Sequence, residues 1–151
     1  DIVTNTDKLW KHSIDHNGFI FTAEKTFGQN TFTTSGYEVG DDIPGLKITV
    51  KDKKTGMDVA SVDFFVHKNK KGDMWLESEM TRVSNAYRNK GLATMMYAYA
   101  KMLGNDVRPS PHQSPQGMDM WRAWNQKGDL HHLTGRDKLR KNLTKAPKVM
   151  K

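Results

Sequence analysis

The sequence AYRNKGLATMMYAYAKML, residues 86–103, places a basic, glycine-containing turn directly before a helical pattern. The first turn of a helix has N–H groups without intrahelical partners and carries the positive end of the helix dipole. Gly91 allows a close approach of the backbone, and Ala93 keeps the first turn free of bulk. Arg88 and Lys90 add positive charge, so this segment predicts a phosphate-binding turn. The alternative is an ordinary loop with a glycine and two solvated basic residues.

Two carboxylates, Glu77 and Glu79, lie two residues apart in the segment 74–83, which has strand composition. Side chains two residues apart on a strand point to the same face. Strict alternation therefore divides the strand residues between two faces. One face is expected to carry Glu77, Glu79, Thr81 and Val83, and the other Leu76, Ser78, Met80 and Arg82. Two carboxylates on one face are candidates for a general base. The alternative is that both are solvated strand residues.

The elements that must position these residues follow one another in a simple order. Alternating apolar residues separated by turn residues predict three consecutive antiparallel strands over residues 46–50, 58–66 and 74–83. Apolar residues at helical spacing predict a helix over residues 92–103 that packs on the sheet. After this helix we expect a short strand within 105–110 and then a second helix over 114–128.

The N-terminal region, residues 1–45, has a less regular pattern. Residues 18–27 and 30–39 have strand composition, whereas residues 4–14 fit a short helix. A length of 151 residues with 36% hydrophobic content is enough for one core. We therefore expect a single domain over residues 1–133.

Positive charge is concentrated in a C-terminal tail, residues 134–151. The tail holds seven Lys or Arg residues against one Asp, so it carries +6 of the net charge of +7. A basic tail can bind nucleic acid or an acidic surface through counterion release. The alternative is a solubilising extension, and it is favoured because no aromatic residue is interspersed with these lysines.

Two function classes are excluded by composition. The chain has no cysteine, which excludes a disulfide framework and a zinc–cysteine cluster, and we expect no metal site. It also has no apolar run of the roughly 18 residues that a membrane span needs. These absences predict a soluble protein that does not bind a membrane.

The segment around the phosphate turn resembles motif A of the GNAT acyltransferase superfamily. In that family a strand ending in Val-x-x-x-Tyr is followed by Arg/Gln-x-x-Gly-x-Gly/Ala and a long helix. The matching residues are Val83, Tyr87, Arg88, Gly91 and Ala93. The order of elements over residues 46–128 is also similar to the family. Residues 109–124 resemble the closing segment of GNAT-like domains in bacteriophage proteins.

The resemblance implies a fold and a cofactor. The fold is of the α+β (α/β) class, with a central mixed, mostly antiparallel sheet that is flanked by helices and splayed between its fourth and fifth strands. The cofactor is acetyl-CoA (coenzyme A), whose pantetheine arm pairs like an extra strand with the backbone of Thr81, Arg82 and Val83. Its pyrophosphate lies against main-chain N–H groups of the turn, namely those of Arg88, Asn89, Lys90, Gly91, Leu92, Ala93 and Thr94.

The resemblance also implies catalytic residues. Glu77 lies where some relatives carry a glutamate base, and Glu79 is its neighbour on the same face. The family usually has a tyrosine four residues before a glycine to protonate the departing thiolate, but here Trp124 precedes Gly128. An indole N–H can donate a hydrogen bond but cannot supply this proton. Three residues nearby in the sequence are candidates to replace the hydroxyl: Ser110, His112 and Ser114.

Two functions follow from the resemblance. The first is an acyl-CoA-dependent N-acyltransferase that transfers an acetyl group to an amine of a protein or small molecule. The alternative is a catalytically weak or inactive GNAT-like module with a structural or binding role in a larger phage or virion protein. The expected location is the cytoplasm, or the host cytoplasm or virion if the chain is phage-encoded.

Overall fold

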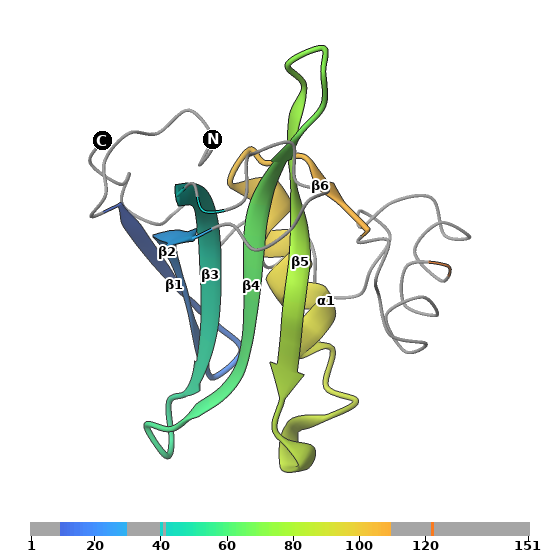
Figure 1. The fold of residues 1–151 in the computed structure, drawn as a ribbon. Helices are drawn as coiled ribbons and strands as arrows, with labels where there is room; N and C mark the ends of the chain where they lie inside the picture. The colour runs from blue at the N-terminus through green and yellow to red at the C-terminus, as the bar shows by residue number, and fades with distance from the viewer. Residues whose placement is uncertain (1–9, 30–39, 41, 110–121, 123–151) are drawn as a thin grey trace.

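The computed structural model describes residues 10–29, 40, 42–109 and 122. Six strands form one sheet, and their spatial order, β1-β2-β3-β4-β5-β6, is also their order along the chain (Figure 1). Each of the first five strands runs antiparallel to the next, whereas β6 runs parallel to β5. The elements are β1 (Lys11–His16), β2 (Phe19–Gln29), β3 (Asp42–Asp52), β4 (Asp58–Lys68), β5 (Met74–Val83), the 3₁₀-helix η1 (Asn85–Tyr87), α1 (Leu92–Met102) and β6 (Val107–Arg108).

The strands form where apolar and polar side chains alternate. In β3, Leu46, Ile48 and Val50 are fully buried, while Lys47 and Thr49 point to the opposite face and are half-buried. The sheet therefore has an apolar face, here called the inner face, and a polar outer face.

The helix α1 covers the inner face and completes the core. It contacts β3, β4, β5 and β6, and Figure 1 shows it behind β4 and β5. Two of its tyrosines meet phenylalanine rings edge-to-face: Tyr97 meets Phe64 at a centroid distance of 5.2 Å, and Tyr99 meets Phe21 at 6.3 Å. The largest fully buried side chains are Tyr99, Phe21, Phe64, Ile43, Leu46, Ile48, Leu76, Met96, Val50 and Val62.

Two tyrosines of α1 also make polar contacts with the sheet. The Tyr97 hydroxyl donates to Ser78 Oγ at 2.6 Å and lies 3.0 Å from Thr81 Oγ1, both on β5. The Tyr99 hydroxyl donates to the carbonyl oxygen of His12 on β1 at 3.1 Å and is also hydrogen-bonded to His12 Nδ1. These hydrogen bonds connect the helix to β1 and to β5, two strands that lie far apart in the strand order of the sheet.

A β-bulge interrupts β5. The register with β4 shifts between Asp63 and Phe64, so that Asp63 pairs with Met80 and Phe64 pairs with Ser78, while Glu79 is left between them. Because of this extra residue, Ser78 and Thr81 both reach Tyr97 on the inner face. The strict alternation expected for this strand is therefore wrong beyond Glu79.

The N-terminal region extends the sheet. Residues 11–16 form β1, so the short helix expected over residues 4–14 is wrong for the described part of that segment. A two-residue loop, Asn17–Gly18, joins β1 to β2, and both residues have positive φ, 53° and 82°. Two consecutive positive φ values are typical of the tight turn that suits a hairpin, and Asn-Gly is its preferred sequence. β2 confirms the strand composition of residues 18–27, whereas β1 stands where the helix was expected.

The fold class expected from the sequence is wrong. The described residues form a curled, six-stranded half-barrel with one α-helix, rather than a sheet flanked by helices. The splay was expected beside Thr81, Arg82 and Val83, which lie on β5, and within the described residues β5 pairs with its neighbour β6 through Leu76 and Glu77. The physical reason is the added β1–β2 hairpin, which enlarges an antiparallel sheet whose accumulated twist then curls it.

Most of the individual elements predicted from periodicity are confirmed. The strands expected at 46–50, 58–66 and 74–83 lie within β3, β4 and β5, and the helix expected at 92–103 is α1. The short strand within 105–110 is β6. Three expected features lie outside the described residues: the strand at 30–39, the helix at 114–128 and the tail at 134–151.

Gly45 in β3 gives a first testable prediction. A Cβ atom at Gly45 would lie 2.6 Å from the carbonyl oxygen of Phe64 and 2.6 Å from Thr26 Oγ1. The carbonyl belongs to the neighbouring strand and cannot rotate away, so we expect Gly45→Ala to lower the free energy of unfolding by about 1–3 kcal/mol. Gly28→Ala is the matched control, since its nearest atom would be on the Phe65 ring at 3.5 Å. Equal urea midpoints for the two variants would contradict the prediction.

A second prediction concerns pH. His12 is buried beside Tyr99, and burial lowers the pKa of His12 and raises the pKa of the Tyr99 hydroxyl. The unfolded chain therefore takes up the His12 proton at a higher pH, near 6.5, than the folded chain does. We expect the free energy of unfolding to fall as the pH drops below that value. In urea unfolding between pH 7.5 and 5.5, His12→Gln should show a shallower pH dependence, and an unchanged slope would show that other groups cause it.

Candidate functional site

The predicted phosphate turn lies between β5 and α1. After η1 the backbone is extended at Arg88 and takes positive φ at Asn89 (62°) and at Gly91 (76°). Gly91 is the N-cap of α1, and no side chain caps the helix there. Every residue from Arg88 to Gly91 is exposed. The turn thus presents two basic side chains next to the positive end of a helix dipole.

Gly91 is required by its backbone conformation rather than by close packing. A Cβ atom there would meet nothing within 4 Å, but φ of 76° is strained for any residue with a side chain. The first turn of α1 contains no acidic residue that would occupy the N-terminal N–H groups or repel an anion. These features are compatible with an anion at the helix N-terminus.

Tyr87 anchors the turn to the sheet. Its hydroxyl donates to Asp52 Oδ2 at 2.6 Å, and its ring meets Phe19 edge-on at 6.1 Å. This hydrogen bond lowers the pKa of the Asp52 carboxyl and raises the pKa of the Tyr87 hydroxyl. The backbone of the turn is also held, because the Ser84 N–H donates to the Val59 carbonyl at 2.9 Å. Tyr87 therefore positions the turn and does not itself point to a ligand.

The three residues expected to bind the cofactor through their backbone have different side-chain environments. Thr81 reaches Tyr97 on the inner face, whereas Arg82 points to the outer face. The Val83 carbonyl accepts a hydrogen bond from Arg88 Nε at 3.4 Å. On the edge of β5 that faces away from β4, the strand pairs with β6, and within the described residues only Leu76 and Glu77 of β5 take part in this pairing. The last six residues of β5 continue beyond that pairing toward the turn.

Glu77 lies in a cluster of aromatic and charged side chains near β6. The Trp75 indole N–H donates to Glu77 Oε2 at 2.6 Å, and His67 Nδ1 lies 3.6 Å from the same oxygen. The side chains of Glu77 and His67 are each only 11% exposed. The Arg108 guanidinium stacks 4.2 Å from the centroid of the Trp75 ring. This cluster holds a nearly buried carboxylate beside an imidazole, which is an arrangement able to accept and relay a proton.

Glu79 has a different environment from Glu77. It lies at the bulge of β5 and is exposed. Partial desolvation, with a smaller contribution from the Asp63 carboxylate, raises the pKa of Glu79. The four other candidates, Ser110, His112, Ser114 and Trp124, lie outside the described residues. Glu77 is the fourth residue of β5, about 20 Å along the strand from Val83, after which the turn begins.

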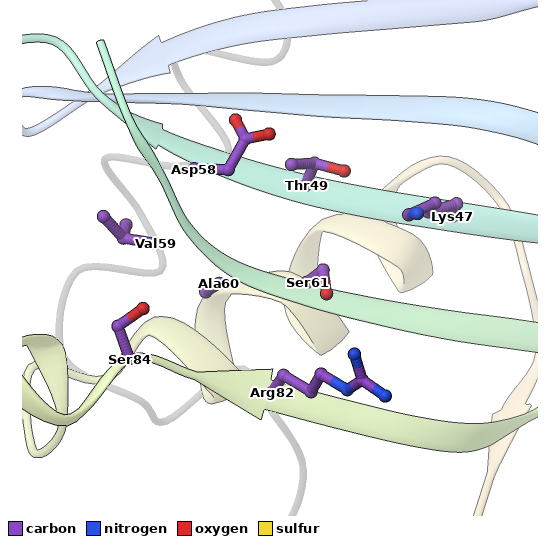
Figure 2. A pocket seen from close by; sticks show the side chains of 8 residues that line it. All are labelled: Lys47, Thr49, Asp58, Val59, Ala60, Ser61, Arg82 and Ser84. Atoms are coloured by element: carbon purple, nitrogen blue, oxygen red, sulfur yellow. The ribbon is translucent and has the colours of Figure 1, made fainter.

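Sequence reasoning did not identify a pocket on the outer face of β3, β4 and β5. Figure 2 shows polar and charged side chains directed over these strands. The cavity has a volume of about 220 Å³ and is lined by Lys47, Thr49, Asp58, Val59, Ala60, Ser61, Arg82 and Ser84. Lys47 and Thr49 alternate with core residues along β3, and this alternation was the available sequence signal. It could not show that Lys47 and Arg82 lie near each other, because they are on different strands.

Comparison of the chain with protein-family models, with curated proteins and with solved structures gives no match in any of the three. Among the described residues, no three His, Cys, Asp or Glu side chains are grouped so that they could hold a metal ion. In the same part of the chain, no helix has the length and apolar character needed to cross a membrane.

Proposed function

We propose that this chain is an acyl-CoA-dependent N-acyltransferase. The observation that carries the proposal is the arrangement along β5: a basic turn at a helix N-terminus lies at one end of the strand, and the nearly buried Glu77 lies toward the other. The proposal rests on this local segment and not on the overall fold.

The turn fits the phosphate end of coenzyme A. The main-chain N–H groups at the start of α1 and the exposed side chains of Arg88 and Lys90 would hold its pyrophosphate. The absence of an acidic residue from the first turn of α1 supports this role. Backbone contacts of this kind need turn geometry and small residues more than particular side chains.

The edge of β5 fits an extended, amide-containing arm. Because the pairing with β6 ends at Glu77, the backbone of Thr81, Arg82 and Val83 is a candidate to pair with pantetheine in the manner of an added strand. Strand pairing would direct the arm from the turn toward Glu77.

Glu77 is the proposed base. Acetyl-CoA would supply an acetyl group activated as a thioester, and the acceptor would supply an amine. The C–N bond would form as the C–S bond breaks, and coenzyme A would leave as its thiol with the second proton that the amine loses. The Glu77 carboxylate would take the proton that the ammonium group of the acceptor must lose, and His67, 3.6 Å away, is placed to share it.

A second function, a binding module without turnover in a larger phage or virion protein, is favoured by one observation. Glu77 Oε2 already accepts a short hydrogen bond from Trp75, and this bond stabilises the carboxylate as a structural group. Such a module would retain the turn and its ligand but lack an effective base.

Coenzyme A binding is the first test. We expect calorimetry to detect binding of coenzyme A, and Arg88→Gln with Lys90→Gln to weaken it about tenfold, which corresponds to about 1.4 kcal/mol. The matched control is Lys70→Gln with Lys71→Gln, because these exposed lysines lie in the β4–β5 hairpin at the other end of the sheet. If the parent protein does not bind coenzyme A, both functions proposed for this site are wrong.

Turnover separates the enzyme from the binding module. We expect Glu77→Gln to lower turnover about a hundredfold and to leave coenzyme A affinity nearly unchanged. Glu79→Gln is the control, since Glu79 is exposed at the bulge. The assay follows acetyl-CoA consumption with polyamines, aminoglycosides and lysine-containing peptides as acceptors. Turnover that is indifferent to Glu77→Gln would refute the base assignment, and binding without turnover would favour the module.

A further inference from the structure

We infer that the outer-face pocket of β3, β4 and β5 is a binding site for a small oxyanion, a phosphate or carboxylate group held by Lys47 and Arg82. The polar side chains of this site, Thr49, Ser61 and Arg82, point away from the face that the helix covers, so they do not contact the N-terminal N–H groups of α1. The inference therefore does not depend on coenzyme A binding.

The centre of the site is a row of polar residues that runs across three strands. Thr49 on β3 pairs with Ser61 on β4, and Ser61 pairs with Arg82 on β5. Side chains directly opposite each other on neighbouring strands have Cβ atoms about 4.5–5.5 Å apart. Two hydroxyl groups and a guanidinium are thus brought together by register alone, although they are far apart in the sequence.

Two basic side chains and one carboxylate line the pocket. Lys47 lies two residues before Thr49 on the same face of β3, and its side chain and that of Arg82 extend over the pocket from opposite sides (Figure 2). Arg82 Nε donates to Met80 Sδ at 2.9 Å, which orients the guanidinium. A guanidinium has five N–H donors, and this contact uses one of them. The remaining donors suit an oxyanion, which guanidinium groups bind with two parallel hydrogen bonds.

Two irregularities in the sheet flank the row. The β3–β4 register shifts between Val50 and Lys51, and the β4–β5 register shifts between Asp63 and Phe64. Bulges increase the local twist and redirect side chains, and they are common beside binding sites. The row lies between these two shifts, and the hollow extends to the first of them, where Val59 and Asp58 line it.

The size and polarity of the pocket limit the ligand. Its volume of about 220 Å³ is below the range of about 300–1,000 Å³ that is usual for drug-sized ligands, so the ligand is small. Asp58, the single carboxylate in the lining, lies near the other end, about 10 Å from Ser61 along β4. A second carboxylate, Asp63, pairs with Lys47 and lies two residues from Ser61 on the same face of β4. The two carboxylates repel an anion from both ends of the row and should confine the oxyanion to Thr49, Ser61 and the Arg82 guanidinium between them.

The test is an NMR titration of the ¹⁵N-labelled protein with sodium phosphate, and separately with sodium acetate, at constant ionic strength. We expect saturable shifts of the amides of Thr49, Ser61 and Arg82 with at least one of the two anions. The better anion identifies the group as phosphate or carboxylate. Arg82→Gln and Lys47→Gln should each weaken the binding about fivefold or more.

Two further variants control the experiment. Lys51→Gln removes the same charge from the same strand, but Lys51 is exposed and does not line the pocket, so binding should be unchanged. Asp58→Asn should tighten binding about twofold, because it removes a repulsive charge. The inference is overturned if neither anion gives saturable shifts, if the shifts map to the start of α1 instead, or if Lys51→Gln weakens binding as much as Arg82→Gln does.

Discussion

The rest of the structure depends on the hydrogen bonds that connect α1 to two distant strands of the sheet, β1 and β5. Tyr97 and Tyr99 are two residues apart on the helix, yet one hydroxyl reaches β5 and the other reaches β1. Strands separated by three others in the sheet can both meet one helix only if the sheet curls around it. The curl gives the inner face enough depth to bury both tyrosine rings, and the outer face is left to carry the polar side chains.

The positions of the candidate sites follow from the division of the sheet into an apolar inner face and a polar outer face. The turn after β5 is fixed by Tyr87, whose hydroxyl bonds to Asp52 at the end of β3, and the start of α1 is fixed by the packing of the helix. The Glu77 cluster and the outer-face pocket both lie on strands whose other faces are buried in the core. A rigid apolar layer therefore supports every group that we expect to bind a ligand, and this is how precise polar sites are usually built.

The local elements could be predicted from the sequence, but their assembly could not. Alternation at Leu46, Ile48 and Val50 predicted a strand, and helical spacing predicted α1, because these patterns come from burial of one face. The Asn17–Gly18 turn was a hairpin signal that the helical interpretation of residues 4–14 overlooked. The bulge at Glu79 has no sequence signature and changes the face of every later residue in β5. The proximity of Lys47 and Arg82 depends on register across three strands, which single-strand patterns do not contain.

The agreement between strand order and chain order has a consequence for folding. Each strand from β2 to β5 pairs with the strand just before it, so the sheet can assemble hairpin by hairpin through loop closures of short sequence separation. The apolar face is complete once β5 has paired, but the helix that covers it comes later in the chain. During synthesis, a nascent chain that has not yet reached Leu92 would expose Phe21, Ile48 and Phe64 on one open surface, a patch of the kind that promotes association between chains.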